Sequence, residues 1–289
     1  MFSIEVISSH HLNNIPSASG IVKSGEHYYI IGDNSPFLFQ LNREYEIISK
    51  TLIYDPTELK GATIPKKVKP DFEAMEMVSE NEMVIFGSGS KSPERAICLR
   101  VFIGATITVK SYNITAFYAS LKKLEIPDNA ELNIEAIAFQ KDQLHFFNRG
   151  TNAIFSFDYF DLIQHFEGLI PFPTSKVRHF NLPKIKGIEA RFSGATAFNN
   201  KPYLLFTASV ENTPNAYDDG EILGSFIGIV SMESNDSTPL LCIRIPSQKS
   251  VKVESVTIDN EISSKEMTVL LVTDSDGGDS TLLKCLLKW

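Results

Sequence analysis

Short apolar strands separated by polar turns recur along the whole chain in five similar segments. Each segment opens with a small or acidic residue, followed by an alternating apolar strand, a turn, a second apolar strand and a polar loop. The five opening residues, called the anchors below, are Ser19, Glu73, Glu135, Ser193 and Glu254. They lie 54 to 62 residues apart in a chain of 289. The repeat therefore covers residues 1–289 as a single domain.

Each segment has room for four strands rich in Val, Ile, Phe and Tyr, bounded by Gly, Asn, Asp and Ser. Four-stranded units repeated around an axis are typical of β-propellers. The sequence thus predicts an all-β, five-bladed propeller with four-stranded blades. In the second and third segments we expect strands at residues 73–78, 83–87, 96–102, 106–112, 135–139, 143–147, 153–158 and 177–182.

The fifth segment is one strand short, because the chain ends soon after its third strand. Residues 2–9 alternate like a strand and precede the first anchor. We expect them to supply the outer strand of the last blade, which closes the ring and removes free sheet edges. The alternative is a simple N-terminal edge strand. Residues 117–126 and 160–169 have helical spacing and are expected as helices outside the blades.

The amino-acid composition excludes some classes of protein but does not identify a function. The 20 Phe and 9 Tyr suit pleated strands, and the net charge of −8 disfavours nucleic acid as a partner. No apolar run is long enough to span a membrane. Cys98, Cys242 and Cys285 lie in apolar runs and read as buried side chains rather than disulfides. Without a signal-peptide pattern we expect a cytoplasmic protein, or an exported one whose signal peptide is missing here.

The inner strands of a propeller all run in one direction, so the five anchors should lie at one height around the axis. The second strand of each blade returns to the same face, and the loop after it should open beside the anchors. These polar loops cover residues 32–36, 87–95, 148–150, 208–221 and 273–279. Their candidate site residues are Asp33, Asn34, Lys91, Arg95, Asn148, Arg149, Glu211 and Asp274.

Three glutamates in one ring raise one another's pKa unless a cation neutralises them. Carboxylate and hydroxyl oxygens suit a hard cation such as Ca²⁺. The ring of Ser19, Glu73, Glu135, Ser193 and Glu254 is therefore a candidate Ca²⁺ site. The alternative is a structural ring that holds neighbouring blades together. The six histidines show no zinc-ligand spacing.

The anchor order Ser, Glu, Glu, Ser, Glu resembles that of the calcium-activated nucleotidases, also called soluble apyrases. The resemblance implies a five-bladed propeller with Ca²⁺ on its axis, held by the anchors. Residues 28–41 resemble the first hairpin of that family, although Asn34 follows Asp33 where the family has a second acid. In residues 148–150 only Arg149 can be carried over. Residues 71–77 and 211–228 are also similar to phytase-like and lactonase-like propellers, many of them uncharacterised bacterial proteins.

Two functions remain open at this point. One is a Ca²⁺-dependent hydrolase of phosphate esters or anhydrides. In that case Arg149, Lys91 and Arg95 would bind the anionic substrate, and Asp33 or Glu211 would act as general base. Asn34, Asn148 and Asp274 would add binding contacts. The other is a non-catalytic binding or scaffold propeller that holds a small molecule, glycan or peptide above a structural ring.

Overall fold

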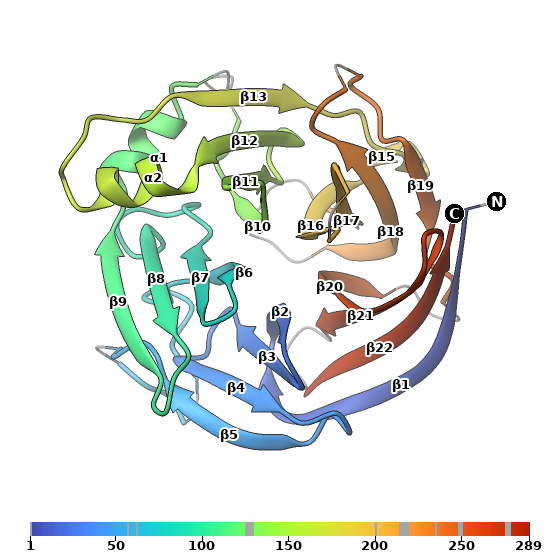
Figure 1. Cartoon of the computed structure of the whole chain (residues 1–289), viewed down its shortest axis with the longest axis horizontal. Helices are drawn as coiled ribbons and strands as arrows, with labels where there is room; N and C mark the ends of the chain where they lie inside the picture. Colours follow the sequence, from blue (N-terminus) through green and yellow to red (C-terminus); the bar gives the residue numbers. More distant parts are fainter. Residues whose placement is uncertain are drawn as a thin grey trace.

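The computed structural model describes residues 2–56, 58–61, 63–124, 130–199, 201–213, 220–234, 236–247, 251–274 and 279–289. These residues form five four-stranded antiparallel sheets arranged as the blades of a propeller around one axis (Figure 1). The fold class predicted from the repeat is confirmed. A small hairpin of β14 (Lys184–Ile185) and β15 (Ile188–Glu189) lies between the third and fourth blades in the chain.

Within each blade the strands are ordered from the axis outward. The first four blades contain, in order, β2 (Ala18–Ser24), β3 (His27–Gly32), β4 (Phe37–Leu41), β5 (Ile47–Leu52); β6 (Phe72–Ser79), β7 (Glu82–Gly87), β8 (Ile97–Phe102), β9 (Thr108–Asn113); β10 (Ile134–Gln140), β11 (Gln143–Asn148), β12 (Ala153–Asp158), β13 (Ser175–His179); β16 (Arg191–Ala197), β17 (Tyr203–Asn212), β18 (Glu221–Ser231), β19 (Leu241–Arg244). The expected strands of the second and third blades are present, with ends shifted by up to three residues.

The last blade combines both ends of the chain. It contains β20 (Lys252–Ser263), β21 (Glu266–Asp274) and β22 (Asp279–Lys288), and its outer strand is β1 (Ser3–Pro16). Strand β1 pairs antiparallel with β22 from Ser3 opposite Lys288 onward, and the two termini lie side by side (Figure 1). The predicted closure is confirmed, and the closing strand is longer than residues 2–9. The ring is therefore held shut by backbone hydrogen bonds between the chain ends.

Every inner strand carries a β-bulge at its anchor. Pairing of β2 with β3 jumps from Ala18 to Gly20, which leaves Ser19 as the extra residue. The same jump surrounds the anchor in each of the other blades, at Glu73, Glu135, Ser193 and Glu254. A bulged residue leaves the regular alternation of the sheet, so its side chain can be re-aimed. The five bulges thus set the anchors apart from the packed faces of the blades.

The apolar core is divided among the interfaces between neighbouring blades. Five clusters of buried side chains are present among the described residues, one at each interface. Phe86 of one blade, for example, packs edge-to-face on Phe146 of the next, with ring centroids 4.9 Å apart. Each blade therefore buries both faces, and the polar side chains are left to the axis and the loops.

Two short helices lie at the outer side of the second and third blades: α1 (Thr115–Leu121) and α2 (Tyr159–Phe166). Both were expected near these positions, outside the blades, but their side chains also contribute to the apolar core. Phe117, Tyr118 and Leu121 of α1 are buried in the cluster between these blades. Neither helix, within the described part of the chain, has the length and apolar character needed to cross a membrane.

Candidate functional site

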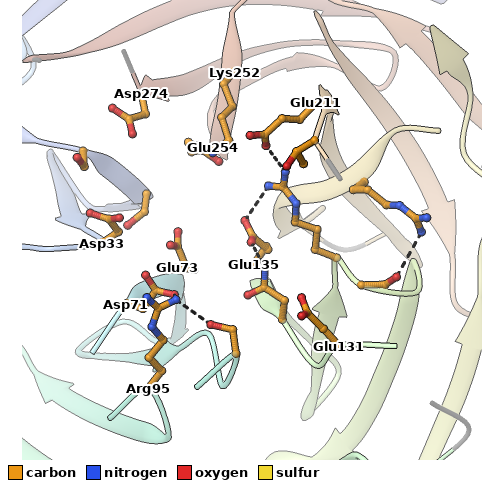
Figure 2. Close-up of a pocket in the computed structure, with 18 of the residues that line it drawn as sticks. Asp33, Asp71, Glu73, Arg95, Glu131, Glu135, Glu211, Lys252, Glu254 and Asp274 are labelled. Atoms are coloured by element: carbon orange, nitrogen blue, oxygen red, sulfur yellow. Dashed lines mark hydrogen bonds and ion pairs between the residues drawn. The ribbon is translucent and has the colours of Figure 1, made fainter. Parts of the chain in front are cut away.

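A polar cavity of about 630 Å³ opens at the mouth where the inner strands begin (Figure 2). Four of the five anchors line it: Ser19, Glu73, Glu135 and Glu254. The loops that follow the second strands also contribute side chains from every blade. The lining residues from these loops and from the strand ends beside them are Asp33, Ser90, Arg95, Arg149, Glu211, Thr213 and Asp274. The convergence of five loops on one ring of anchors, expected from strand direction, is therefore present.

The two serine anchors hold the blades together. The Ser19 hydroxyl donates to the carbonyl oxygen of Phe72 at 2.5 Å, in the next blade. The Ser193 hydroxyl donates to the carbonyl oxygen of Val253 at 2.6 Å, again in the next blade. Ser193 is buried and is not among the residues that line the cavity. The five-anchor Ca²⁺ ring therefore lacks one of its expected members, and both serine protons are already used within the scaffold.

Two of the glutamate anchors are neutralised by neighbouring side chains. Arg149 lies between two carboxylates, with nitrogen–oxygen distances of 2.6 Å to Glu211 and 3.5 Å to Glu135 (Figure 2). Lys252 lies 2.9 Å from Glu254, and this carboxylate is the largest cause of the raised pKa of the lysine. The counter-charge that a ring of glutamates requires is thus supplied here by the protein's own basic groups.

The carboxyl groups on either side of Arg149 differ in their acidity. Burial raises the pKa of Glu135, although Arg149 opposes the rise. The amide of Asn133 donates to the same side chain at 2.6 Å. Burial also acts on Glu211, but Lys252, the Gly220 amide and Arg149 outweigh it, so the pKa of Glu211 lies below its ordinary value. One cavity therefore holds a carboxyl that keeps its proton more readily and one that loses it more readily.

A compact acidic cluster lies at the side of the first and second blades. Asp33, Asp71 and Glu73 each offer one carboxylate oxygen, and these atoms lie within 4.8 Å of one another. The Lys69 ammonium contacts Asp33 and lies 2.6 Å from Asp71. Asp71 also accepts from Arg95 at 2.5 Å and from Ser88 at 2.6 Å. The cluster is thus one that could hold a metal ion, and at present a lysine ammonium bridges two of its members.

Glu73 differs from the other acids of the cluster. No side chain or amide in the described part of the chain forms a hydrogen bond or ion pair with its carboxylate. Burial raises the pKa of Glu73 well above its usual value, with further contributions from Asp71, Glu135 and Asp33. A carboxyl with a strongly raised pKa at the wall of a cavity is typical of functional sites.

Several residues that shape this cavity were not predicted from the repeat. Five of them stand two positions before the anchors and all line the cavity: Ser17, Asp71, Asn133, Arg191 and Lys252. Every one is polar, so the signal was present in the repeat, one alternation step ahead of the anchors. Lys69 does not stand at a position that the repeat shares among the blades. It lies in the loop before Asp71, and the sequence pattern does not predict the course of that loop.

Other candidate residues lie away from the cavity wall. Asn148 is buried; its side chain accepts from the backbone N–H of Asn133 at 2.7 Å and donates to the Thr151 hydroxyl, which fixes the turn after β11. The Asn34 amide donates to Ser17 at 3.3 Å. The Lys91 ammonium donates to the Lys67 carbonyl oxygen at 3.0 Å. None of Asn148, Asn34 and Lys91 lines the cavity. Their binding roles therefore stay predictions from the sequence.

Two expected loops are shorter than the pattern suggested. Strand β17 continues to Asn212 and β18 begins at Glu221, so only the middle of residues 208–221 connects strands. Glu211 therefore projects from a strand end rather than from a loose loop. In residues 273–279 the Asp274 side chain lines the cavity. Residues 214–219 and 275–278 lie outside the described residues.

Solved structures support the fold. A crystal structure of glutaminyl cyclase from Myxococcus xanthus matches with a TM-score of 0.59 at 8% identity, over 99% of this chain and 97% of that chain. A luciferin-regenerating enzyme matches with a TM-score of 0.51 at 11% identity, over 100% of this chain and 98% of that chain. Such low identities show architecture and not activity. The resemblance to calcium-activated nucleotidases is tested by neither match.

No curated protein sequence matches the chain. A family model does match it, over residues 14–287, which takes in the inner strands of all five blades and all five anchors. The chain therefore belongs to a family of unknown function, DUF6929.

Proposed function

We propose that the central cavity is the active site of a hydrolase that uses a divalent cation, Ca²⁺, held by Asp33, Asp71 and Glu73. The observation that carries this proposal is the cluster itself: three carboxylates within 4.8 Å, one of them without a partner among the described residues. Oxygen-only ligands of this kind suit Ca²⁺. The proposed ligand set shares Glu73 with the ring of anchors and replaces the remaining members by Asp33 and Asp71.

The charge of the cavity supports a cation. Nine carboxyl side chains line it against six lysines and arginines. The lysine that bridges the cluster, Lys69, has a flexible stem, so its ammonium can yield the position between Asp33 and Asp71 to a metal ion. A doubly charged ion would also lower the pKa of Glu73 and allow that carboxyl to ionise.

A phosphate ester or anhydride is the proposed substrate class. A bound cation would polarise a phosphoryl oxygen there. Lys252 lies across the cavity from the cluster (Figure 2), and Arg149 lines the same cavity, so both can contact the remaining anionic oxygens. Glu135 is the proposed general base, because its raised pKa brings it nearer to neutral pH and Asn133 orients it. Of the two bases suggested by the sequence, Asp33 becomes a metal ligand in this scheme and Glu211 stays paired with Arg149.

Phosphate release with and without metal tests the proposal. Nucleoside diphosphates and p-nitrophenyl phosphate are incubated with the protein in Ca²⁺ or in EDTA. We expect Ca²⁺-dependent release that falls at least about tenfold in Glu73→Gln, because this change removes a charged ligand of the ion. Glu44→Gln, an exposed acid on an outer turn, is the matched control and should keep full activity.

Two outcomes separate this proposal from a non-catalytic pocket. If Ca²⁺ binds with a Glu73-dependent affinity but no substrate in the panel turns over, the catalytic half of the proposal fails and a ligand-binding propeller remains. If Ca²⁺ does not bind at all, the metal assignment fails as well. The perturbed carboxyls Glu73 and Glu135 favour the catalytic function over a passive pocket.

A further inference from the structure

A second cavity, of about 1060 Å³, lies where the inner strands end. Its lining comes from the last residues of β6, β10, β16 and β20 and from Lys23 and Gly25 at the end of β2. It shares no described residue with the central cavity, which is built from the strand beginnings. The propeller therefore has two separate polar cavities, one at each end of its inner strands.

The basic groups of the second cavity are already satisfied. Lys23 lies 3.6 Å from Asp259, and Lys141 lies 2.8 Å from Glu233. The Lys201 ammonium donates to a backbone carbonyl oxygen at 3.1 Å. Asp259 accepts further hydrogen bonds from hydroxyl groups on β3 and β21. These groups leave no free positive charge for an anionic ligand among the described residues of the lining.

The Glu76 carboxylate, unlike these basic groups, has no charged partner in the described part of the cavity. Its side chain lines this cavity and the residue is only 7% exposed. One carboxylate oxygen accepts from the Met77 amide at 2.9 Å, whereas no hydrogen bond of normal geometry reaches the buried Oε2. The Thr196 hydroxyl and the Ala197 amide lie near enough to this carboxyl to lower its pKa, but neither carries a positive charge. A buried Oε1 of Glu261, in the same lining, also has none. An unpaired buried carboxylate costs several kcal/mol when it is ionised, so a positively charged partner is what this wall lacks.

The remaining walls mix polar and apolar side chains, and the group of three acids that could share a metal ion, among the described residues, lies in the central cavity and not here. Phe139 and Phe198 line the cavity together with Val78 and Ile258. A metal ion would require several further oxygen ligands at short distance. An organic ammonium ion needs only one or two carboxylate oxygens, and its alkyl part can pack on aliphatic and aromatic side chains. The composition of the walls therefore favours an organic cation over a metal ion.

We propose that the second cavity is a binding site for a small organic ammonium ion, whose nitrogen pairs with Glu76 and whose carbon chain packs on Phe139 and Phe198. This site is independent of the hydrolase proposed for the central cavity. Burial also raises the pKa of Glu76 to about 8, with the Met77 amide, the Thr196 hydroxyl and the Ala197 amide opposing the rise. A bound ammonium ion would supply the charge that lets Glu76 ionise.

The single tryptophan of the chain offers a direct readout. Trp289 packs edge-to-face on Phe198, with ring centroids 5.4 Å apart, so a ligand against Phe198 should change its fluorescence. The protein is titrated with n-butylammonium and 1,4-diaminobutane, and in separate arms with NaCl and CaCl₂. We expect a saturable change with both amines. The affinity for both amines should fall about tenfold or more in Glu76→Gln. It should be unchanged in Glu73→Gln, which alters only the central cavity.

Binding should also depend on pH. Glu76 must release its proton to pair with the ammonium ion, so affinity for n-butylammonium should increase as the pH rises from about 6 to about 9. The other ionisable groups that face this cavity are Lys23, Lys141, Lys201, Asp259 and Glu261. Glu261→Gln should keep the pH dependence of binding, since Glu76 remains.

Three results would overturn the assignment. The first is the absence of any saturable change with either amine. The second is equal amine affinity in the wild type and in Glu76→Gln. The third is a Glu76-dependent response to CaCl₂ or NaCl without one to the amines, which would make the site a metal site. Circular dichroism and thermal melting of Glu76→Gln, an isosteric change, verify that the blade is folded.

Discussion

Replacing Lys69 by methionine is the sharpest test of the acidic cluster. The side chain is almost buried, and its ammonium bridges Asp33 and Asp71, with 2.6 Å to the latter. Removing one partner of a buried ion pair costs about 3–5 kcal/mol, because a charge is left uncompensated. Arg95 still pairs with Asp71 at 2.5 Å, so the lower end of that range, about 3 kcal/mol, applies.

The loss can be expressed as a melting temperature. Unfolding entropy near 2 cal/mol/K per residue gives about 0.6 kcal/mol per degree for a chain of 289 residues. Lys69→Met should therefore melt about 5 °C lower than the wild type in EDTA. If Ca²⁺ takes the position of the ammonium, a concentration 100 times its Kd returns about 2.7 kcal/mol, or roughly 4–5 °C. In the wild type the gain should be smaller, because Lys69 competes with the ion.

Differential scanning calorimetry in EDTA and in Ca²⁺ provides the measurement. Lys67→Met, which removes an exposed lysine nearby, is the control and should melt like the wild type in both buffers. Adding Asp71→Asn to Lys69→Met should abolish the effect of Ca²⁺. The reasoning is refuted if Lys69→Met melts lower but Ca²⁺ does not restore it, or if Ca²⁺ shifts both proteins equally.

Three further predictions concern the scaffold and the second cavity. Ser193→Ala should lower stability by about 1–2 kcal/mol in chemical denaturation, through the lost bond to the Val253 carbonyl oxygen, and should leave Ca²⁺ affinity unchanged. Asp259→Asn should cost about 3 kcal/mol in the same assay, because Lys284 at 2.8 Å loses its partner where the last blade meets the first. Burial raises the pKa of Glu76 from 4.5 to about 8, so its contribution to stability is complete below pH 4.5 and is lost as the pH rises toward 8. The free energy of unfolding of Glu76→Gln should therefore rise relative to that of the wild type, by up to about 1.4 kcal/mol per pH unit across that interval. Thermal melts at pH 5, 7 and 9 measure the difference.

The repeat in the sequence was sufficient for the architecture. Alternating apolar strands between polar turns predicted five blades, and the missing strand of the last segment predicted that the N-terminal strand β1 would close the ring. Pattern alone could not show that α1 inserts Phe117 into the core. Periodicity reports which face of a helix is apolar but not which surface covers it.

The candidate site was predicted in outline and not in its chemistry. Glu73 and Glu135 were expected at the mouth, and both line the cavity. The ion pairs that neutralise the ring were not foreseeable, because they depend on how long side chains such as Arg149 and Lys252 cross the cavity. Pairing of that kind is decided by three-dimensional distance, which anchor spacing does not contain.

The bulges explain how one scaffold accommodates different chemistry at its mouth. Each anchor is the extra residue of an inner strand, so it is exempt from the face-to-face packing that fixes its neighbours as small or apolar. A serine can therefore tie two blades together at Ser193, while a glutamate at the equivalent position, Glu73, faces the cavity without a partner in the described part of the chain. Replacing a serine by a glutamate at an anchor position would therefore leave the strand register unchanged. Propellers with the same architecture can thus differ in activity, and for this chain the argument for function rests on the acidic cluster and not on the fold.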